Sequence, residues 1–236
     1  MTNRTAATSP KFYARLAGVM FLLYIAIGVT QMTVFGGATA GENPAAKLAN
    51  MAQHATDVRV NVVLGLLTCF IALTLGVALY ALTREQEPYL AMLALICRVG
   101  EGVIGGVYMS LTLGLLALAT AEGANAPDPA AAQALGAFVL KARSWNPTIA
   151  ATFFAVGSTL FCYLFLRARS IPVSLAWLGV AASILLVVAL PLQLAGILHG
   201  SVTYFVWIPM AVFEVVLAVW LIIKGVALQE IDAGRE

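Results

Sequence analysis

The sequence predicts an all-α fold: a polytopic membrane bundle of six transmembrane helices plus two short amphipathic helices on its outer side. Two observations support this prediction. Of the 236 residues, 61% are apolar and 10% are charged, whereas a soluble domain has about 45–50% apolar and about 25% charged residues. The apolar residues also gather in six runs, and a bilayer-spanning helix needs about 20 such residues. A soluble enzyme, a disordered chain and a nucleic-acid binder are excluded, and the expected partner is the lipid bilayer.

The six predicted spans are Phe12–Phe35, Val58–Leu82, Tyr89–Thr120, Asn146–Leu166, Pro172–Leu198 and Tyr204–Ile223. The first run, from Leu16 to Phe35, is about twice as long as a signal-peptide core, so we expect it to be retained. The third run is longer than a bilayer is thick and must tilt or project from it.

The positions of lysine and arginine predict the orientation, because these residues favour the cytoplasmic side. One side carries eight of them and the other side carries four: Arg4, Lys11, Arg15, Arg84, Arg167, Arg169, Lys224 and Arg235 against Lys47, Arg59, Lys141 and Arg143. We therefore expect both termini in the cytoplasm. The chain divides into a cytoplasmic segment 1–11, a six-helix domain 12–226 and a cytoplasmic tail 227–236.

Two long loops on the predicted outer side each contain a helix-start signal. Asn43-Pro44 and Asp128-Pro129 both place a capping residue before a first-turn proline. The apolar residues that follow share one face in each case, which predicts short amphipathic helices lying on the outer surface. They are either ordered connectors or a pair of lids.

Three charged residues fall near the middle of predicted spans, where a charge costs about 2.5–3.5 kcal/mol on insertion scales. Arg98 and Glu101 lie three residues apart on the third span, and Glu214 lies halfway along the sixth. The third span continues this polar face through Gly105, Tyr108 and Thr112 at helical spacing, which predicts a central place in the bundle.

The three charges have two interpretations. In the first, Arg98 bridges Glu101 and Glu214 and fixes the register of the helices, as buried ion pairs can do. In the second, the cluster binds or relays a solute or proton, because two carboxyls and one cation leave one excess negative charge that a proton can neutralise.

Further polar residues lie toward the predicted outer ends of the spans. Pro191 and Pro209 also interrupt the last two spans there, and each removes a backbone donor. We therefore expect a cavity open to the outer side, with Arg98, Glu101 and Glu214 at its floor. The candidates for its lining are Tyr108, Gln31, Arg59, Asn61, Asn146, Gln193 and His199.

Motifs of known catalytic or cofactor chemistry do not occur in the sequence. HExxH, GxSxG and the P-loop are missing, and no GxGxxG leads into a helix as it does in a dinucleotide-binding fold. Cys69, Cys97 and Cys162 lie singly in apolar runs without metal-ligand spacing. The sequence predicts no cofactor, no metal site and no catalytic residue.

Several short motifs resemble one known family. They are Ala14-Arg15-Leu16-Ala17-Gly18, Arg98-Val99-Gly100-Glu101, Phe161-Cys162-Tyr163-Leu164, Arg169-Ser170-Ile171-Pro172, and Glu214 followed by Trp220-Leu221-Ile222-Ile223-Lys224-Gly225. Together they resemble the bacterial domain-of-unknown-function family 4386 over residues 12–226. The resemblance implies six spans in a bacterial inner membrane. It assigns no activity, and the Ala-rich segment 121–137 departs from it.

The first hypothesis is therefore a membrane protein that binds or moves a small solute or proton through an outward-facing polar cavity. The alternative is a non-catalytic accessory or sensor subunit whose buried charges are structural or pair with a partner helix. An enzyme that uses the carboxyls is a third and less favoured class. The sequence leaves open a homo-oligomer or a partner subunit.

Overall fold

The computed structural model describes residues 9–123 and 127–227, and these residues form helices without any strand. Six helices are long and apolar enough to cross a membrane, which confirms the predicted fold class. The predicted end segments 1–11 and 227–236 lie largely outside the described residues. The helices are α1 (Pro10–Ala38), α2 (Pro44–Gln53), α3 (Ala55–Thr83), α4 (Pro88–Ala119), α5 (Pro129–Ala168), α6 (Val173–Leu194), α7 (Val202–Phe205) and α8 (Ile208–Ile223).

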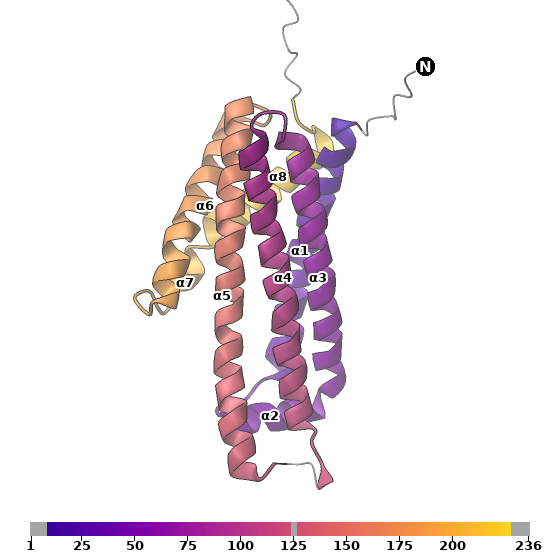
Figure 1. The fold of residues 1–236 in the computed structure, drawn as a ribbon, viewed down its shortest axis with the longest axis vertical. Coiled ribbons are helices and arrows are strands. Elements are labelled where there is room, and N and C mark those ends of the chain that lie inside the picture. The colour runs from indigo at the N-terminus through magenta and orange to yellow at the C-terminus, as the bar shows by residue number, and fades with distance from the viewer. Residues whose placement is uncertain (1–8, 124–126, 228–236) are drawn as a thin grey trace, which may run out of the picture.

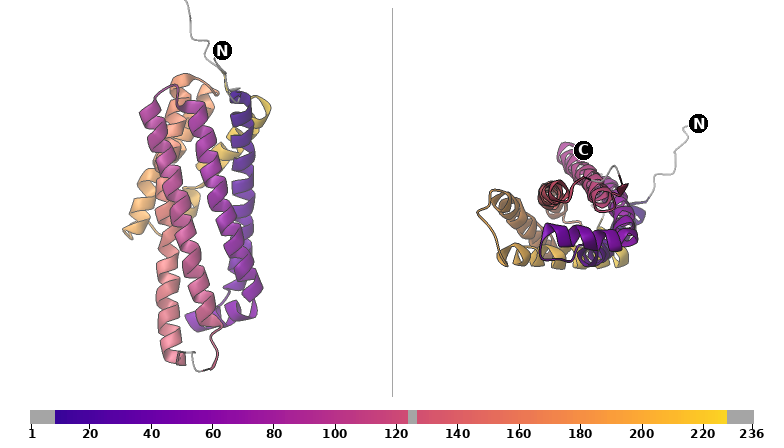
Figure 2. Two further views of the ribbon diagram at one scale, coloured as in Figure 1. Left: turned by 45° about the vertical axis from the view of Figure 1, so that its right-hand side comes forward. Right: turned by 90° about the horizontal axis from the view of Figure 1, so that it is seen from below.

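The helices form an elongated bundle in which chain neighbours run antiparallel (Figure 1). The pairs α1 and α3, α3 and α4, α4 and α5, and α5 and α6 pack together, and α8 closes the bundle against α1 and α6. Helix α1 begins and α8 ends at the same end of the bundle, while α2 lies across the opposite end (Figure 2). We call these the terminal end and the α2 end.

The helices differ in length, and this difference defines which end projects from a bilayer. Helix α6 has 22 residues, or about 33 Å, which matches a hydrocarbon core of about 30 Å. Helix α5 has 40 residues, or about 60 Å, and is far too long to fit inside. The turn from α6 to α8 lies partway along the bundle in Figure 1, so the α2 ends of α4 and α5 extend beyond it.

The first predicted short helix is present as α2. Asn43 caps it, because its Oδ1 accepts a hydrogen bond from the Ala46 N–H at 2.9 Å. Leu48 and Met51 are buried against the ends of neighbouring helices. Both the cap and the apolar face follow from the sequence pattern.

The second predicted short helix is not a separate element. Asp128 caps it as expected, accepting from the Ala130 and Ala131 N–H groups at 3.0 Å each, but the helix then continues through Pro147 to Ala168. The prediction was wrong on this point because alanine and leucine after Pro129 favour helix strongly. Pro147 removes one backbone hydrogen bond without ending the helix.

Two apolar clusters hold the bundle together. The larger gathers side chains of α1, α3, α4, α5, α6 and α8 toward the terminal end, and includes Phe161, Phe165 and Leu217. The smaller joins α2 to the neighbouring ends of α1, α3, α4 and α5, with Met51 fully buried. The polar residues that define the candidate site line a space at the centre of α1, α3, α4, α5 and α8.

Candidate functional site

The charged residues of α4 form an ion pair inside the bundle. The Arg98 Nη1 lies 2.9 Å from the Glu101 Oε2, one helical turn away, and the two side chains are 1% and 5% exposed. The polar face predicted for the third span therefore points into the protein. Two buried charges in contact with each other avoid the larger cost that either would carry alone.

Tyr24 of α1 completes the environment of Glu101. Its hydroxyl donates a hydrogen bond to the Glu101 Oε1 at 2.6 Å, so both carboxyl oxygens have a partner. The Arg98 guanidinium also lies 5.8 Å from the centre of the Tyr24 ring and 5.0 Å from that of Phe154 on α5. Three helices thus meet around one ion pair.

Glu214 of α8 has a different environment. It is buried at 9% exposure, yet within residues 9–123 and 127–227 it has neither a hydrogen-bond partner nor an ion pair within 4.0 Å. One interpretation of the sequence has Arg98 bridge Glu101 and Glu214. Among the described residues it pairs with Glu101 alone. Within the part of the chain that the structure describes, Glu214 is thus a buried carboxyl without a side-chain partner.

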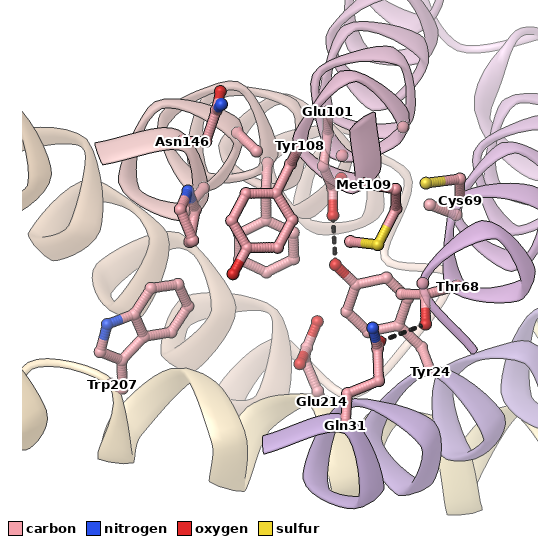
Figure 3. Close-up of a pocket in the computed structure, with 18 residues that line it drawn as sticks. Tyr24, Gln31, Thr68, Cys69, Glu101, Tyr108, Met109, Asn146, Trp207 and Glu214 are labelled. Carbon is pink, nitrogen blue, oxygen red and sulfur yellow. Dashed lines mark hydrogen bonds between the residues drawn. The ribbon is translucent and has the colours of Figure 1, made fainter. Parts of the chain in front are cut away.

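A cavity of about 360 Å³ lies beside these residues (Figure 3). The carboxyl of Glu214 and the hydroxyl of Tyr108 point into it from different helices, and the Tyr24–Glu101 pair borders it. Its lining consists of Tyr24, Gln31, Gly65, Thr68, Cys69, Ala72, Glu101, Gly102, Gly105, Tyr108, Met109, Asn146, Pro147, Ala150, Ala151, Phe154, Trp207 and Glu214.

The lining residues are ordered along the bundle. Along α1, Tyr24 lies nearer the terminal end than Gln31 does, and along α4, Glu101 lies nearer this end than Tyr108 does. Glu214 lies near the middle of α8. If the termini are cytoplasmic, Glu101 lies at the inner end of the cavity. The Arg98 side chain lies behind this end and does not line the cavity itself.

The seven predicted lining residues fall into three groups. Tyr108, Gln31 and Asn146 line the cavity. Asn61 is buried behind its wall, where its backbone carbonyl accepts from the Gln31 Nε2 at 3.4 Å. The remaining three candidates are outside the lining: Arg59 and His199 are exposed and Gln193 is half-buried.

Several residues that shape the site were not predicted. Tyr24, Phe154 and Trp207 supply aromatic walls, and Thr68 donates to the Gln31 Oε1 at 2.9 Å. The sequence contains a signal for Tyr24, because a hydroxyl inside an apolar span needs a hydrogen-bond partner. Phe154 carries no such signal. Trp207 stacks on Phe154 with ring centres 6.2 Å apart.

A second buried arginine lies toward the α2 end. Arg143 of α5 is 9% exposed, with its guanidinium 3.5 Å from the centre of the Phe35 ring and 4.2 Å from that of Tyr108. Its Nε donates to the Thr112 Oγ1 at 3.0 Å. The sequence interpretation counted Arg143 as a loop charge, because it placed the start of the span after this residue.

The side chains at the site indicate which kind of ligand it can bind. Within the part of the chain that the structure describes, no three His, Cys, Asp or Glu side chains come together as a metal site would require. The cavity instead combines one free carboxyl, several aromatic rings and small apolar side chains. Such a space suits an organic solute better than a metal ion.

Comparisons with known proteins give one match. The family model described as Domain of unknown function (DUF4386) matches residues 16–225. No curated protein and no solved structure matches the chain.

Proposed function

The chain belongs to the domain of unknown function family DUF4386, and from that premise we propose that this membrane protein binds a small solute in its central cavity. Glu214 is the group that meets the solute in this proposal. The observation that supports it most is a buried carboxyl without a side-chain partner on the wall of a cavity of about 360 Å³.

The electrostatics of Glu214 support a binding role. A lone carboxylate inside a membrane protein is costly, and the cost falls when it gains a proton or an opposite charge. The Arg98 guanidinium is already committed to Glu101 at 2.9 Å. Glu214 is therefore the group whose partner changes when a solute or a proton enters, and a fixed ion pair stands behind it.

The size and walls of the cavity support an organic solute. Ligand pockets span about 300–1,000 Å³ and are mostly apolar, with a few polar groups that orient the ligand. This cavity, at about 360 Å³, is at the small end of that range. Its lining combines apolar side chains, such as Met109 and Ala150, with polar groups from five helices.

The proposal extends to movement of the solute or a proton across the membrane. We place both termini in the cytoplasm of a bacterial inner membrane, with residues 12–226 as one transmembrane domain. The apolar cluster around Phe161 and Leu217 then lies on the inner side of the cavity, and we propose that the cavity opens toward the outer side. Movement requires these two ends to open in turn.

The native cysteines provide the test of solute entry. Cys69 lines the cavity, whereas Cys97 and Cys162 are buried away from it. The small neutral reagent methyl methanethiosulfonate is applied to the protein in mild detergent, and peptide mass spectrometry identifies the modified cysteine. We expect modification of Cys69 and sparing of the other two.

A matched pair of variants makes this test specific. Ala150→Phe fills the cavity, whereas Ala181→Phe adds the same ring at an exposed position of α6. We expect slower Cys69 modification in the first variant and an unchanged rate in the second. Absence of Cys69 modification in the folded wild-type protein, with full modification after unfolding, would contradict the proposal.

A further inference from the structure

We infer that the solute is a monovalent organic cation, an ammonium group on a small apolar body. This inference rests on the proposed function and names the class of ligand for the same cavity. Three features of the site support it: the charge that faces the cavity, the aromatic rings around it, and the position of the two arginines.

The charge that faces the cavity is negative. Among residues 9–123 and 127–227, two acidic side chains line it, Glu101 and Glu214, and no lysine or arginine does. Glu101 is engaged by the Tyr24 hydroxyl at 2.6 Å and by Arg98 at 2.9 Å. Glu214 keeps its capacity for a partner, so a ligand that enters meets one available carboxylate and gains most if it carries one positive charge.

Aromatic rings surround this carboxyl. Tyr24, Tyr108 and Phe154 come from α1, α4 and α5, Trp207 directly precedes α8, and all four line the cavity. Ring faces attract cations, most strongly those of tryptophan, and they favour weakly hydrated organic cations. The site itself already contains this interaction, because the Arg98 guanidinium lies 5.0 Å from the centre of the Phe154 ring.

The arginines define where the cation binds. Arg98 lies behind the carboxyls and is neutralised by Glu101. Arg143 lies toward the α2 end against the Tyr108 ring, whose centre is 4.2 Å away, and it does not line the cavity. Its charge opposes a second cation at that end. The favourable position is therefore away from Arg143, between Glu214 and Trp207.

Protection of Cys69 tests the charge preference directly. The rate of Cys69 modification by methyl methanethiosulfonate is measured with increasing benzyltrimethylammonium, benzyl alcohol or benzenesulfonate. These probes share one ring and differ in charge. We expect the cation to slow the reaction at the lowest concentration and the sulfonate to give no protection. Equal protection by the neutral or anionic probe, or none by the cation, would overturn the inference.

Two variants assign the effect to the proposed residues. Glu214→Gln keeps the shape and removes the charge, so we expect half-protection to need a roughly tenfold higher concentration of benzyltrimethylammonium. Glu85→Gln, an exposed acid in the α3–α4 turn, serves as the matched control and leaves protection unchanged. Unchanged protection in Glu214→Gln would also overturn the inference.

This experiment distinguishes failure of the proposed solute binding from failure of the proposed cationic ligand class. Modification of Cys69 without any added probe reports that a small solute enters the cavity, whatever the charge preference. The same modification rate in Glu214→Gln shows that this variant still folds with its cavity intact. A cavity that admits the reagent but ignores the cation would contradict only the ligand class.

Discussion

Arg98 and Glu101 stabilise the bundle as a pair, and each is costly without the other. The 2.9 Å contact lies where the side chains are 1% and 5% exposed, so water cannot take the place of a lost partner. Within the described residues, the Arg98 nitrogens have no hydrogen bond besides this ion pair. The charge of Arg98 therefore depends on Glu101 and on the nearby rings.

Removal of one partner should destabilise the protein more than removal of both. We expect Arg98→Met to lower the free energy of unfolding by about 3–5 kcal/mol, because Glu101 is left as an unpaired buried charge. The double variant Arg98→Met/Glu101→Met should recover much of this loss. Unfolding in detergent micelles measures both. A double variant less stable than Arg98→Met alone would show that the pair is not the main interaction of Glu101.

The sequence was informative about charged residues inside the spans, because the free-energy cost of a charge in a membrane is evident from its position alone. Arg98, Glu101 and Glu214 could be predicted to cluster because charges inside spans are rare and need partners. Tyr24 and Phe154 could not be assigned to the site, since aromatic residues are common in apolar runs and only the packing of α1 and α5 places them there. Arg143 was misplaced because its burial depends on where α5 begins.

At the scale of elements, α8 closes the bundle through a close contact with α1. Gly18 of α1 faces α8, and a methyl group at this position would lie 2.6 Å from the Ala218 carbonyl oxygen and 2.7 Å from the Ile222 side chain. The absence of a side chain lets the two helices approach closely, as small residues do in membrane bundles. This contact fixes the helix that carries Glu214.

Gly18→Ala should therefore destabilise the protein by about 1–3 kcal/mol, because backbone atoms of α8 have to move. Gly28→Ala in the same helix is the matched control, since a methyl group there meets nothing within 4 Å. We expect the control to be neutral or slightly stabilising, as alanine is the better helix former. Thermal unfolding in detergent compares them, and equal effects would contradict the close α1–α8 contact.

The elements themselves were mostly predictable, and the exception has a physical reason. Length and apolarity were enough for α1, α3, α4 and α6, because a span must satisfy its backbone internally. The continuity of α5 was not predicted, because proline often marks a helix start and Pro147 lies after Asn146. Here the preceding turns were already helical, so the proline sits inside a helix.

At the scale of the whole molecule, six crossings place the two ends of the described chain at the same end of the bundle (Figure 1). The Glu42 loop before α2 lies at the opposite end from the α3–α4 turn that contains Glu85. These two exposed acids are a matched pair for labelling. They report which end faces the cytoplasm.

We expect Glu42→Cys to react with a membrane-impermeant maleimide on intact cells, and Glu85→Cys to react only after permeabilisation. The physical basis is the excess of lysine and arginine on the side of Glu85. Labelling of Glu85→Cys on intact cells, with protection of Glu42→Cys, would reverse the orientation and turn the cavity toward the cytoplasm.

The proposed function and the proposed ligand class both concern the occupant of the space between α4 and α8. The most direct measurement is a crystal structure with 4-bromobenzyltrimethylammonium, whose bromine is located by anomalous scattering. The account predicts a bromine site inside the cavity, with the ammonium group beside Glu214 and the ring against Trp207. Bromine found only outside the cavity, at saturating concentration of the probe, would contradict it.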